Sequence, residues 1–243
     1  MDHLYGRNSV FEALRAARRP VQRVLVARGA HGIEDLVAEA RLRRVPVDSV
    51  DRYRLDRLGG AHHQGVVAEA AAFPYAHLDS LPPAGDSPLL LVLDSLQDPQ
   101  NFGTLLRTAQ ATGVDGVLIP EHRAVGVTPA VSNASAGAVE HLRIVRVTNL
   151  ARTLQQLKAS GVWTFGLAVD AEQAYWAADL SGPIAIVVGS EGSGLSRLVR
   201  ETCDILVAIP MAGGSVQSLN ASVAGSLVLY EGFRQRGATL RQP

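Results

Sequence analysis

Cysteine and lysine are nearly absent from these 243 residues, and each absence excludes a class of protein. Cys203 is the only cysteine, which excludes a disulfide framework and cysteine-based zinc or iron–sulfur sites. Lys158 is the only lysine and lies in no G-x-x-x-x-G-K-[ST] motif, which excludes a P-loop nucleotide hydrolase. No apolar run approaches 18 residues, and the N-terminus has no signal-peptide pattern. We therefore expect a soluble, cytoplasmic protein with no membrane partner, and no cluster of ligands predicts a metal.

Charge is balanced over the whole chain but not along it. Basic and acidic residues both number 23, so no global charge indicates a nucleic-acid binder. Residues 1–75 carry 12 arginines against 9 acids, a net charge of +3, and residues 76–243 carry a net charge of −3. Arginine supplies 22 of the 23 cations, which suits planar, bidentate contacts, although a GC-rich genome would produce the same bias.

The pattern of apolar residues predicts two α/β domains. Residues 1–73 alternate short helices and strands, beginning with a helix over Ser9–Ala17 that Asn8 could cap. Residues 74–88 are rich in proline and read as a linker. Residues 89–243 form the second domain, in which continuous apolar runs predict strands buried on both faces of a parallel sheet. These strands are Leu89–Leu93, Val117–Ile119, Ile144–Val147, Phe165–Val169, Ile184–Val188 and Ile205–Ile209.

Helices are predicted between these strands. Gly113 and Gly161 stand where glycines that end a helix are expected. The predicted helices are Gly103–Thr112, Pro129–Glu140, Leu150–Ser160, Leu195–Glu201 and Leu219–Gln235. Alternating strands and helices favour an open sheet with helices on both faces.

Three loops after predicted strands carry polar and glycine residues. In open α/β sheets ligands bind outside the carboxyl ends of the strands, so these loops are the candidate site. Each one alone has a structural alternative. Gly189–Gly194 could be only a tight turn, Arg107 an ordinary surface charge, and Ser218 with Asn220 only a helix start.

The combination is more specific. In order along the chain stand D-x-x-N-x-G-x-x-x-R over residues 98–107, G-S-E-G-S-G-L over residues 189–195, and I-P-M followed by S-L-N-A-S-V-A over residues 209–224. With the segments Tyr5–Leu14 and His63–Ala68, this set resembles the SpoU/TrmH family of RNA ribose 2′-O-methyltransferases, within the SPOUT superfamily. The resemblance covers nearly the whole chain, and its domain order resembles the RlmB type.

The resemblance implies a fold and a cofactor. It implies a SPOUT α/β domain with a deep trefoil knot, preceded by a small L30e-like RNA-binding domain, and a homodimer formed partly by Leu219–Gln235. Packing of that helix on its own sheet is the structural alternative. S-adenosyl-L-methionine would be the methyl donor. The residues implied to contact it are Leu167, Gly189, Glu191, Gly192, Ile209, Met211, Ser218 and Leu219.

The resemblance also implies catalytic residues, namely Asn101, Arg107, Glu191, Ser218 and Asn220. Arginine stays protonated in proteins, so we expect Arg107 to orient the ribose and to stabilise negative charge on its oxygen; base catalysis by this residue stays an alternative.

The implied substrate is large-subunit ribosomal RNA, methylated at a guanosine. A tRNA methyltransferase and a non-catalytic RNA-binding or ribosome-assembly protein are the alternatives. Basic residues of the first domain could contact phosphates or simply be solvated. The candidates for RNA contact are Arg7, Arg15, Arg18, Arg19 and His63.

Overall fold

The computed structural model describes residues 1–213 and 218–237, and the chain divides into two compact units. The first unit contains residues 1–74 together with two later segments, 102–107 and 127–141. The second unit contains residues 75–101, 108–126 and the chain from residue 142 onward. The prediction of two α/β parts is thus met, and the later segments of the first unit are an addition that sequence reasoning did not anticipate.

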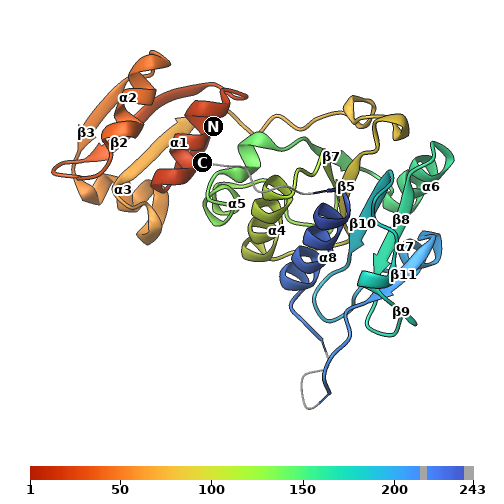
Figure 1. Cartoon of the computed structure of the whole chain (residues 1–243). Coiled ribbons are helices and arrows are strands. Elements are labelled where there is room, and N and C mark those ends of the chain that lie inside the picture. Colours follow the sequence, from red (N-terminus) through yellow and green to blue (C-terminus); the bar gives the residue numbers. More distant parts are fainter. Residues whose placement is uncertain (214–217, 238–243) are drawn as a thin grey trace. The chain divides into compact units, whose positions relative to one another are not determined.

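The first unit is a four-stranded sheet with helices on both faces (Figure 1). The strand order is β1-β4-β2-β3, in which only β2 and β3 are parallel. Its elements are β1 (Asp2–Tyr5), α1 (Arg7–Ala16), β2 (Val21–Ala27), α2 (Glu34–Leu42), β3 (Val47–Val50), α3 (Arg52–Gly59), β4 (Val66–Ala70) and α5 (Pro129–Ala134).

Two apolar clusters hold the first unit together, one on each face of the sheet. Val10 and Leu14 of α1 and Leu36 of α2 pack with Val24 of β2 on one face. On the other face, Leu55 of α3 packs with strand residues that alternate with the first set, as the two-residue period of a strand requires. The helices α1 and α2 therefore cover one face, and α3 covers the other.

The second unit is a parallel sheet with the strand order β7-β6-β5-β10-β8-β11-β9. All the expected strands of this part are present in it. The strands are β5 (Leu89–Leu93), β6 (Gly116–Pro120), β7 (Ile144–Val147), β8 (Trp163–Leu167), β9 (Gln173–Ala174), β10 (Ile184–Val188) and β11 (Ile205–Ala208). The helices are α4 (Pro99–Ala111), whose residues 102–107 belong to the first unit, α6 (Leu150–Ala159), α7 (Arg197–Thr202) and α8 (Ala221–Gln235).

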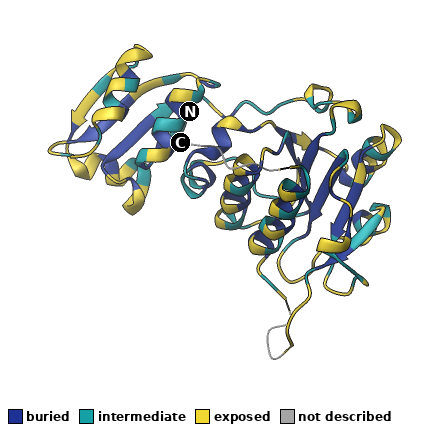
Figure 2. Ribbon diagram, viewed as in Figure 1, coloured by how far each residue is buried: buried dark blue, intermediate teal, exposed yellow. Residues whose placement is uncertain are grey.

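Helices pack on both faces of the parallel sheet, and the central strands are buried throughout (Figure 2). Leu154 of α6 and Val199 of α7 pack with Val92 and Val187 on one face. On the other face, Gly232 of α8 lies 3.9 Å from the side chains of Ile184 and Ile186, measured from where its Cβ would stand. The alternation between Ile186 and Val187 thus separates the two helical layers. The knot stays a prediction, because strand pairing does not determine how a chain threads.

Most element boundaries agree with the sequence prediction within a few residues, and Gly113 and Gly161 have the positive φ values expected just past a helix. Three elements differ from the prediction. Strand β1 was missed because only Leu4 of its four residues is buried. Asn8 lies inside α1, whose N-cap position is Gly6, so its predicted role as a cap is wrong. The short strand β9 was also not expected.

The helix predicted over Pro129–Glu140 is broken. Helix α5 ends at Ala134, Ala136 and Gly137 have positive φ, and a 3-10 turn follows over Ala138–His141. A Cβ at Gly137 would lie 2.6 Å from the Cβ of Glu12 on α1. The break therefore lets the backbone of this segment approach α1 more closely than a continuous helix with side chains would.

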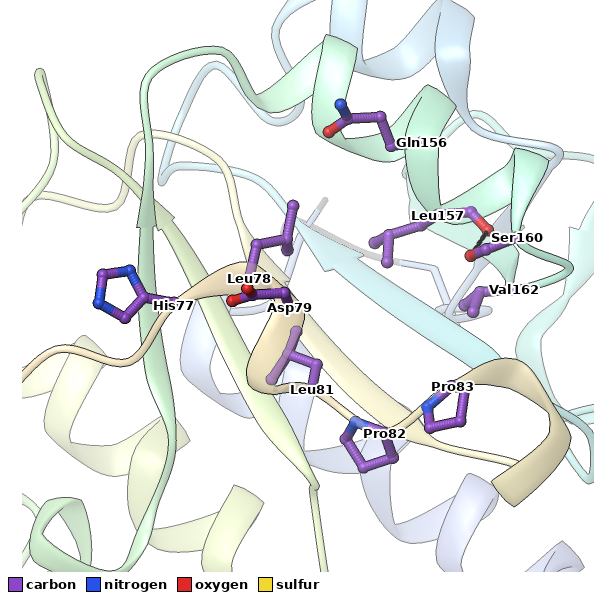
Figure 3. Close-up of a pocket in the computed structure, with 10 residues that line it drawn as sticks. All are labelled: His77, Leu78, Asp79, Leu81, Pro82, Pro83, Gln156, Leu157, Ser160 and Val162. Atoms are coloured by element: carbon purple, nitrogen blue, oxygen red, sulfur yellow. Dashed lines mark hydrogen bonds between the residues drawn. The ribbon is translucent and has the colours of Figure 1, made fainter.

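One pocket of the second unit lies away from the predicted loops. It is lined by the segment His77–Pro83, the last turn of α6 and Val162, just before β8 (Figure 3). This places it at the amino ends of the strands. Ligand chemistry in an open α/β sheet is expected at the opposite edge, so we do not take this pocket as the candidate site.

Candidate active site

The strand order places the predicted loops at a topological switch point. Strands β6 and β7 continue the sheet on one side of β5, whereas β10, β8 and β11 continue it on the other. The loops that follow the neighbours β5 and β10 therefore leave the same edge of the sheet, which is the edge where open α/β sheets bind ligands.

Asp94 connects these two loops directly. Its buried carboxylate accepts a hydrogen bond from the backbone N–H of Ser196 at 2.6 Å, and its own N–H donates to Val188 at 2.8 Å. Sequence reasoning did not single out Asp94. A carboxylate that directly follows a fully apolar strand was the available signal, because such a group must find donors when it is buried.

The loop after β10 closes on itself as a tight turn. Ser190 and Gly194 exchange two backbone hydrogen bonds of 3.0 Å each. A Cβ at Gly189 would lie 2.1 Å from the carbonyl carbon of Gly194, so only glycine fits there. Gly192 has a φ of 84°. The tight-turn interpretation is therefore correct for the backbone, and the turn presents Glu191 toward the other loops.

One polar side chain from each of the three loops joins a single cluster, in which two amides meet the carboxylate of Glu191. The side-chain amide of Asn101 donates to Glu191 Oε1. The amide of Asn220 donates to the same oxygen at 2.7 Å and to Asn101 Oδ1 at 3.0 Å. A carboxylate only accepts hydrogen bonds, so both amides present their NH₂ groups to it, and the oxygen of Asn101 is left to receive Asn220.

Helix ends position two of these side chains. Asp98 caps α4 by accepting from the N–H of Asn101 at 3.1 Å, which places Asn101 in the first turn. Asn220 caps α8, with its carbonyl oxygen accepting from Ser222 N–H at 2.9 Å. The helix-start interpretation of Asn220 is thus correct, and its amide nitrogen is still available to join Glu191.

The other two residues implied to be catalytic lie near these in sequence. Arg107 is exposed on α4, six residues after Asn101 and so about 9 Å further along the helix axis. Among the described residues, Arg107 has no ion-pair partner. Ser218 is exposed two residues before the cap of α8.

The residues implied to contact the cofactor gather at the carboxyl ends of neighbouring strands. Leu167 ends β8, Gly189 follows β10, and Ile209 follows β11, while β8 lies between the other two strands. The register pairs Val187 with Gly166 and Val207 with Leu167, so these ends are level. Met211, Gly192 and Leu219 are at least partly accessible in the adjoining loops. Residues 214–217 of the same stretch lie outside the described residues.

Most of the basic residues predicted to contact RNA have internal partners. Arg19 is buried: its guanidinium pairs with Glu140 and with Asp2, the latter at 3.0 Å. His63 is fully buried, and its ring contacts Asp56 at 2.9 Å. The structure argues against both as RNA contacts, because neither side chain reaches solvent. Arg7 donates to the carbonyl of Gln64, Arg15 pairs with Glu12 at 3.4 Å, and Arg18 is half-buried.

Neither a metal site nor a reactive thiol stands out. Within residues 1–213 and 218–237, no group of three or more His, Cys, Asp or Glu side chains could hold a metal ion, and no helix has the length and apolar character of a membrane span. Burial, together with the neighbouring Asp204, raises the pKa of the Cys203 thiol to about 12. The thiol therefore stays protonated near neutral pH and serves as a packing group.

Comparison with known families matches both parts of the chain. Residues 88–230 match the family described as the SpoU rRNA Methylase family. Residues 3–76 match the family described as RNA 2′-O ribose methyltransferase substrate binding. The Bacillus subtilis (strain 168) protein YacO, assigned to the TrmH family of tRNA/rRNA methyltransferases, is 44% identical over 240 residues, covering 97% of this chain and 96% of that protein.

Solved structures agree with this over different lengths. An RNA 2′-O ribose methyltransferase superposes with a TM-score of 0.82 at 32% identity, covering 96% of this chain and 88% of that one. The SpoU methyltransferase AviRb from Streptomyces viridochromogenes, in complex with AdoMet, gives 0.80 at 28% identity, with 96% and 89% covered. The TrmH/SpoU tRNA modifying enzyme of A. aeolicus gives 0.56 at 29% identity, covering 62% of this chain and 76% of that one.

Proposed function

Because the chain belongs to the SpoU methylase family, we propose that it transfers a methyl group from S-adenosyl-L-methionine to a ribose 2′-oxygen of ribosomal RNA. The observation that carries this proposal is the meeting of Asn101, Glu191 and Asn220 at the switch point of the parallel sheet. Three separate motifs supply these residues, and a protein that only bound RNA would have no need to join them.

The strand ends beside this cluster fit the methyl donor. Adenosine is a planar group with hydrogen-bonding edges, and the level ends of β10, β8 and β11 offer backbone N–H and C=O groups with apolar side chains such as Ile209 and Leu219. The residues proposed to hold it are those named above, from Leu167 to Leu219. S-adenosylmethionine would supply a methyl group from its positively charged sulfonium, and the rest of the cofactor would leave as a neutral thioether.

The chain's own residues have two tasks in this reaction. The cluster around Glu191 holds the loops after β5, β10 and β11 in one geometry. Arg107 orients the ribose and stabilises the negative charge that develops on the 2′-oxygen as its hydroxyl proton leaves to solvent. That charge is used up when the oxygen–carbon bond forms and the methyl–sulfur bond breaks. Its guanidinium keeps its charge throughout, which is why we assign it electrostatic work and not proton removal.

The first unit favours ribosomal RNA over tRNA as the substrate. An rRNA methyltransferase from Sinorhizobium meliloti matches 96% of this chain, whereas the likeness to a tRNA modifying enzyme covers only 62% of it. A large-subunit guanosine is the target that the RlmB-type domain order suggests, and we propose it on that basis. Such an enzyme would act in the cytoplasm, where ribosomes are assembled.

We further propose a homodimer that uses α8. Val223, Leu227 and Tyr230 recur at helical spacing on this helix and are 46%, 39% and 53% exposed. An apolar stripe of this kind on the outer side of a helix, opposite the residues that pack on β10, suits a second copy of the chain.

Labelled methyl transfer to unmodified large-subunit ribosomal RNA, with tRNA in parallel, tests the proposal. A methylated 2′-oxygen cannot attack its phosphate, so alkaline cleavage maps the site. One resistant position in ribosomal RNA supports the proposal and identifies the nucleotide. Label on tRNA alone keeps the chemistry but overturns the substrate. Cofactor binding without any transfer, on free RNA and on ribosomal precursor particles, favours a non-catalytic RNA-binding protein.

A further inference from the structure

Helix α3 of the first unit turns an unusually basic face to solvent. Leu55 is fully buried against the sheet, and a Cβ at Gly59 would lie 2.8 Å from that of Tyr5, so this side of the helix packs closely. Arg52, Arg54 and Arg57 are all exposed on the remaining surface. None of these arginines is among the RNA contacts expected from the sequence, which are Arg7, Arg15, Arg18, Arg19 and His63.

The three guanidinium groups of α3 have no ion-pair or hydrogen-bond partner among the described residues. Arg15, Arg23 and Arg43 of the same unit, by contrast, each pair with a carboxylate. The acids near α3 have other partners: Asp51 pairs with Arg28 at 3.1 Å and Asp56 contacts His63 at 2.9 Å. Helix α3 therefore carries three arginines against one acid, Asp56, and none of the three arginines is held in an ion pair within the described residues.

The contact between His63 and Asp56 has a definite polarity. The backbone N–H of Gly65 donates to Nδ1 of His63, so Nδ1 is the acceptor and Nε2 carries the proton that goes to Asp56. Asp56 is thereby held toward the buried ring. Among the described residues it forms no ion pair with Arg52 or Arg57.

Two of these arginines also oppose the dipole of their own helix. Arg52 and Arg54 lie in the first turn of α3, which has no acidic residue. Positive charge at the amino end of a helix is unfavourable, because the unpaired N–H groups there are already positive. Arginines at these two positions lower the stability of the helix, and they are exposed and have no partner among the described residues. Their presence therefore points to an external anion.

Tyr53 adds an aromatic surface to this face. It is 72% exposed, and it stands four residues before Arg57, so the two side chains are neighbours on the side of α3 opposite Leu55. Bases of unpaired RNA stack on exposed aromatic rings, while arginines hold the phosphates between them. Acidic protein surfaces or anionic lipids would use the charge but would not need an exposed aromatic ring beside the guanidinium groups.

We propose that the exposed face of α3, formed by Arg52, Tyr53, Arg54 and Arg57, binds an unpaired segment of the RNA substrate. One base stacks on Tyr53 and the flanking phosphates pair with the arginines. The inference rests on the proposed function and extends it by assigning the RNA contact to a particular surface of the first unit, the face of its sheet opposite α1 and α2.

RNA binding by the full-length chain tests this surface. The probe is a fluorescein-labelled, unstructured 12-nucleotide RNA, followed by anisotropy at several salt concentrations. For Arg54→Gln/Arg57→Gln we expect at least about tenfold weaker binding. The slope of the logarithm of the binding constant against the logarithm of the salt concentration should also become shallower by about 1.4, or about 0.7 for each lost phosphate contact. For Tyr53→Ala we expect about tenfold weaker binding, with Tyr53→Phe within about twofold of wild type, because the phenyl ring still stacks.

A matched pair of arginines provides the control. Arg41 and Arg44 are exposed in the same unit and have no carboxylate partner among its described residues, but they lie at the end of α2 and in the turn before β3. They are thus at the other end of β3 and away from the face that α3 covers. Arg41→Gln/Arg44→Gln should bind the 12-nucleotide RNA within about twofold of wild type.

Four outcomes separate this inference from the proposed function. If the control pair weakens binding as much as the α3 pair, charge alone explains the effect and the inference is overturned. Tyr53→Ala binding like wild type overturns it as well. Normal methyl transfer by wild type, with unchanged RNA binding by every α3 variant, overturns the inference and leaves the function intact. Loss of RNA binding in the α3 variants of a chain that transfers no methyl group supports the surface and refutes the function. Hydrogen exchange of the β2 and β4 backbone amides verifies that the first unit of each variant is folded, and calorimetric binding of S-adenosylmethionine verifies the second unit.

Discussion

The side chain of Asn220 connects helix α8 to Glu191. Its amide nitrogen donates to Glu191 at 2.7 Å, while its carbonyl oxygen caps the helix through the N–H of Ser222 at 2.9 Å. One residue therefore starts the last helix and positions the carboxylate of the preceding loop. The two tasks use different atoms, and substitutions can separate them.

Replacement of Asn220 by serine should retain the cap and lose the amide donor. We expect Asn220→Ser to unfold within about 0.5 kcal/mol of wild type, since serine caps helices as well as asparagine, yet to transfer methyl groups more slowly. Asn220→Ala should lose about 1 kcal/mol more, because neither function remains. Thermal unfolding and initial rates of methyl transfer measure the two effects.

Asn220→Asp provides the sharpest comparison. It retains the cap but brings a second carboxylate against Glu191, so like charges replace a hydrogen bond. Methyl transfer by Asn220→Asp should be slower than by Asn220→Ser. If all three variants transferred methyl groups as fast as wild type, the contact with Glu191 would have no part in the reaction.

The parallel sheet was predictable because its strands are buried on both faces. Runs such as Leu89–Leu93 and Ile184–Val188 are continuously apolar, as strands covered on both faces require. Strand β1 could not be predicted from the apolar pattern, because it lies at an edge of its sheet and carries only one buried residue, Leu4. The break in the helix after Ala134 could not be predicted either, because it depends on the close approach of Gly137 to α1, a contact between residues distant in sequence.

The site was predictable to the extent that its motifs are local. Asn101, Glu191 and Asn220 each stand in a loop after a strand, and the order of the strands then brings them together. The roles of Arg19 and His63 were not predictable, because an arginine paired with a carboxylate 121 residues away has the same local sequence as one that faces RNA. Only the burial of Arg19 tells the two apart.

Arg107 is the residue on which the proposed chemistry depends most. Arg107→Lys retains the charge but loses the planar fork, and Arg107→Ala loses both. We expect turnover to fall about 100- to 1000-fold in Arg107→Ala, comparable to removal of one donor from an oxyanion site, with a smaller loss in Arg107→Lys. Single-turnover methyl transfer at saturating cofactor measures this.

The affinity for S-adenosylmethionine serves as the control for Arg107. Arg107 is proposed to contact the ribose of the RNA and not the cofactor. Calorimetry should therefore give the same dissociation constant for S-adenosylmethionine with wild type, Arg107→Lys and Arg107→Ala. Normal turnover in Arg107→Ala with unchanged cofactor binding would refute the assigned role. If Arg107 were instead the base, Arg107→Lys should move the rise of its pH–rate profile to lower pH, because an amine loses its proton at lower pH than a guanidinium.

A buried ion pair should make the first unit sensitive to single substitutions. The side chains of Arg19 and Glu140 are 2% and 1% exposed, and Glu140 also accepts from Ser132 at 3.1 Å. Glu140→Ala leaves the guanidinium buried without its main partner, and we expect a loss of about 3–5 kcal/mol. Arg19→Met/Glu140→Leu should lose much less than the two single substitutions together.

The measurement must report on the first unit. Trp163 and Trp176, the chain's two tryptophans, both lie in the second unit, so their fluorescence is not suited to it. Hydrogen exchange of the β2 and β4 backbone amides over a denaturant series follows the unfolding of the first unit. A loss below about 1 kcal/mol for Glu140→Ala would mean that water replaces the missing carboxylate.

Acid should weaken the contacts that hold the end of α8. Hydrogen bonds from Arg234 and Gln235 lower the pKa of Glu231 to about 2. Gln235 in turn donates to the carbonyl of Ala178 at 3.0 Å and accepts from the N–H of Leu180 at 2.7 Å. Since an unfolded glutamate titrates at about 4.3, this contribution to stability is complete above that pH and is lost as the pH falls toward 2.

Glu231→Gln should therefore reduce the dependence of stability on pH between about 4.3 and 2, and lower stability at neutral pH. Trp176 lies two residues before Ala178, so its fluorescence in denaturant series from pH 2 to 7 follows the contact. Glu201→Gln is the matched control, because its pair with Arg197 is largely exposed and contributes little to stability. If both variants changed the pH dependence equally, the general loss of an acidic group would explain it, and the contact from Glu231 through Gln235 to Ala178 would have no particular role.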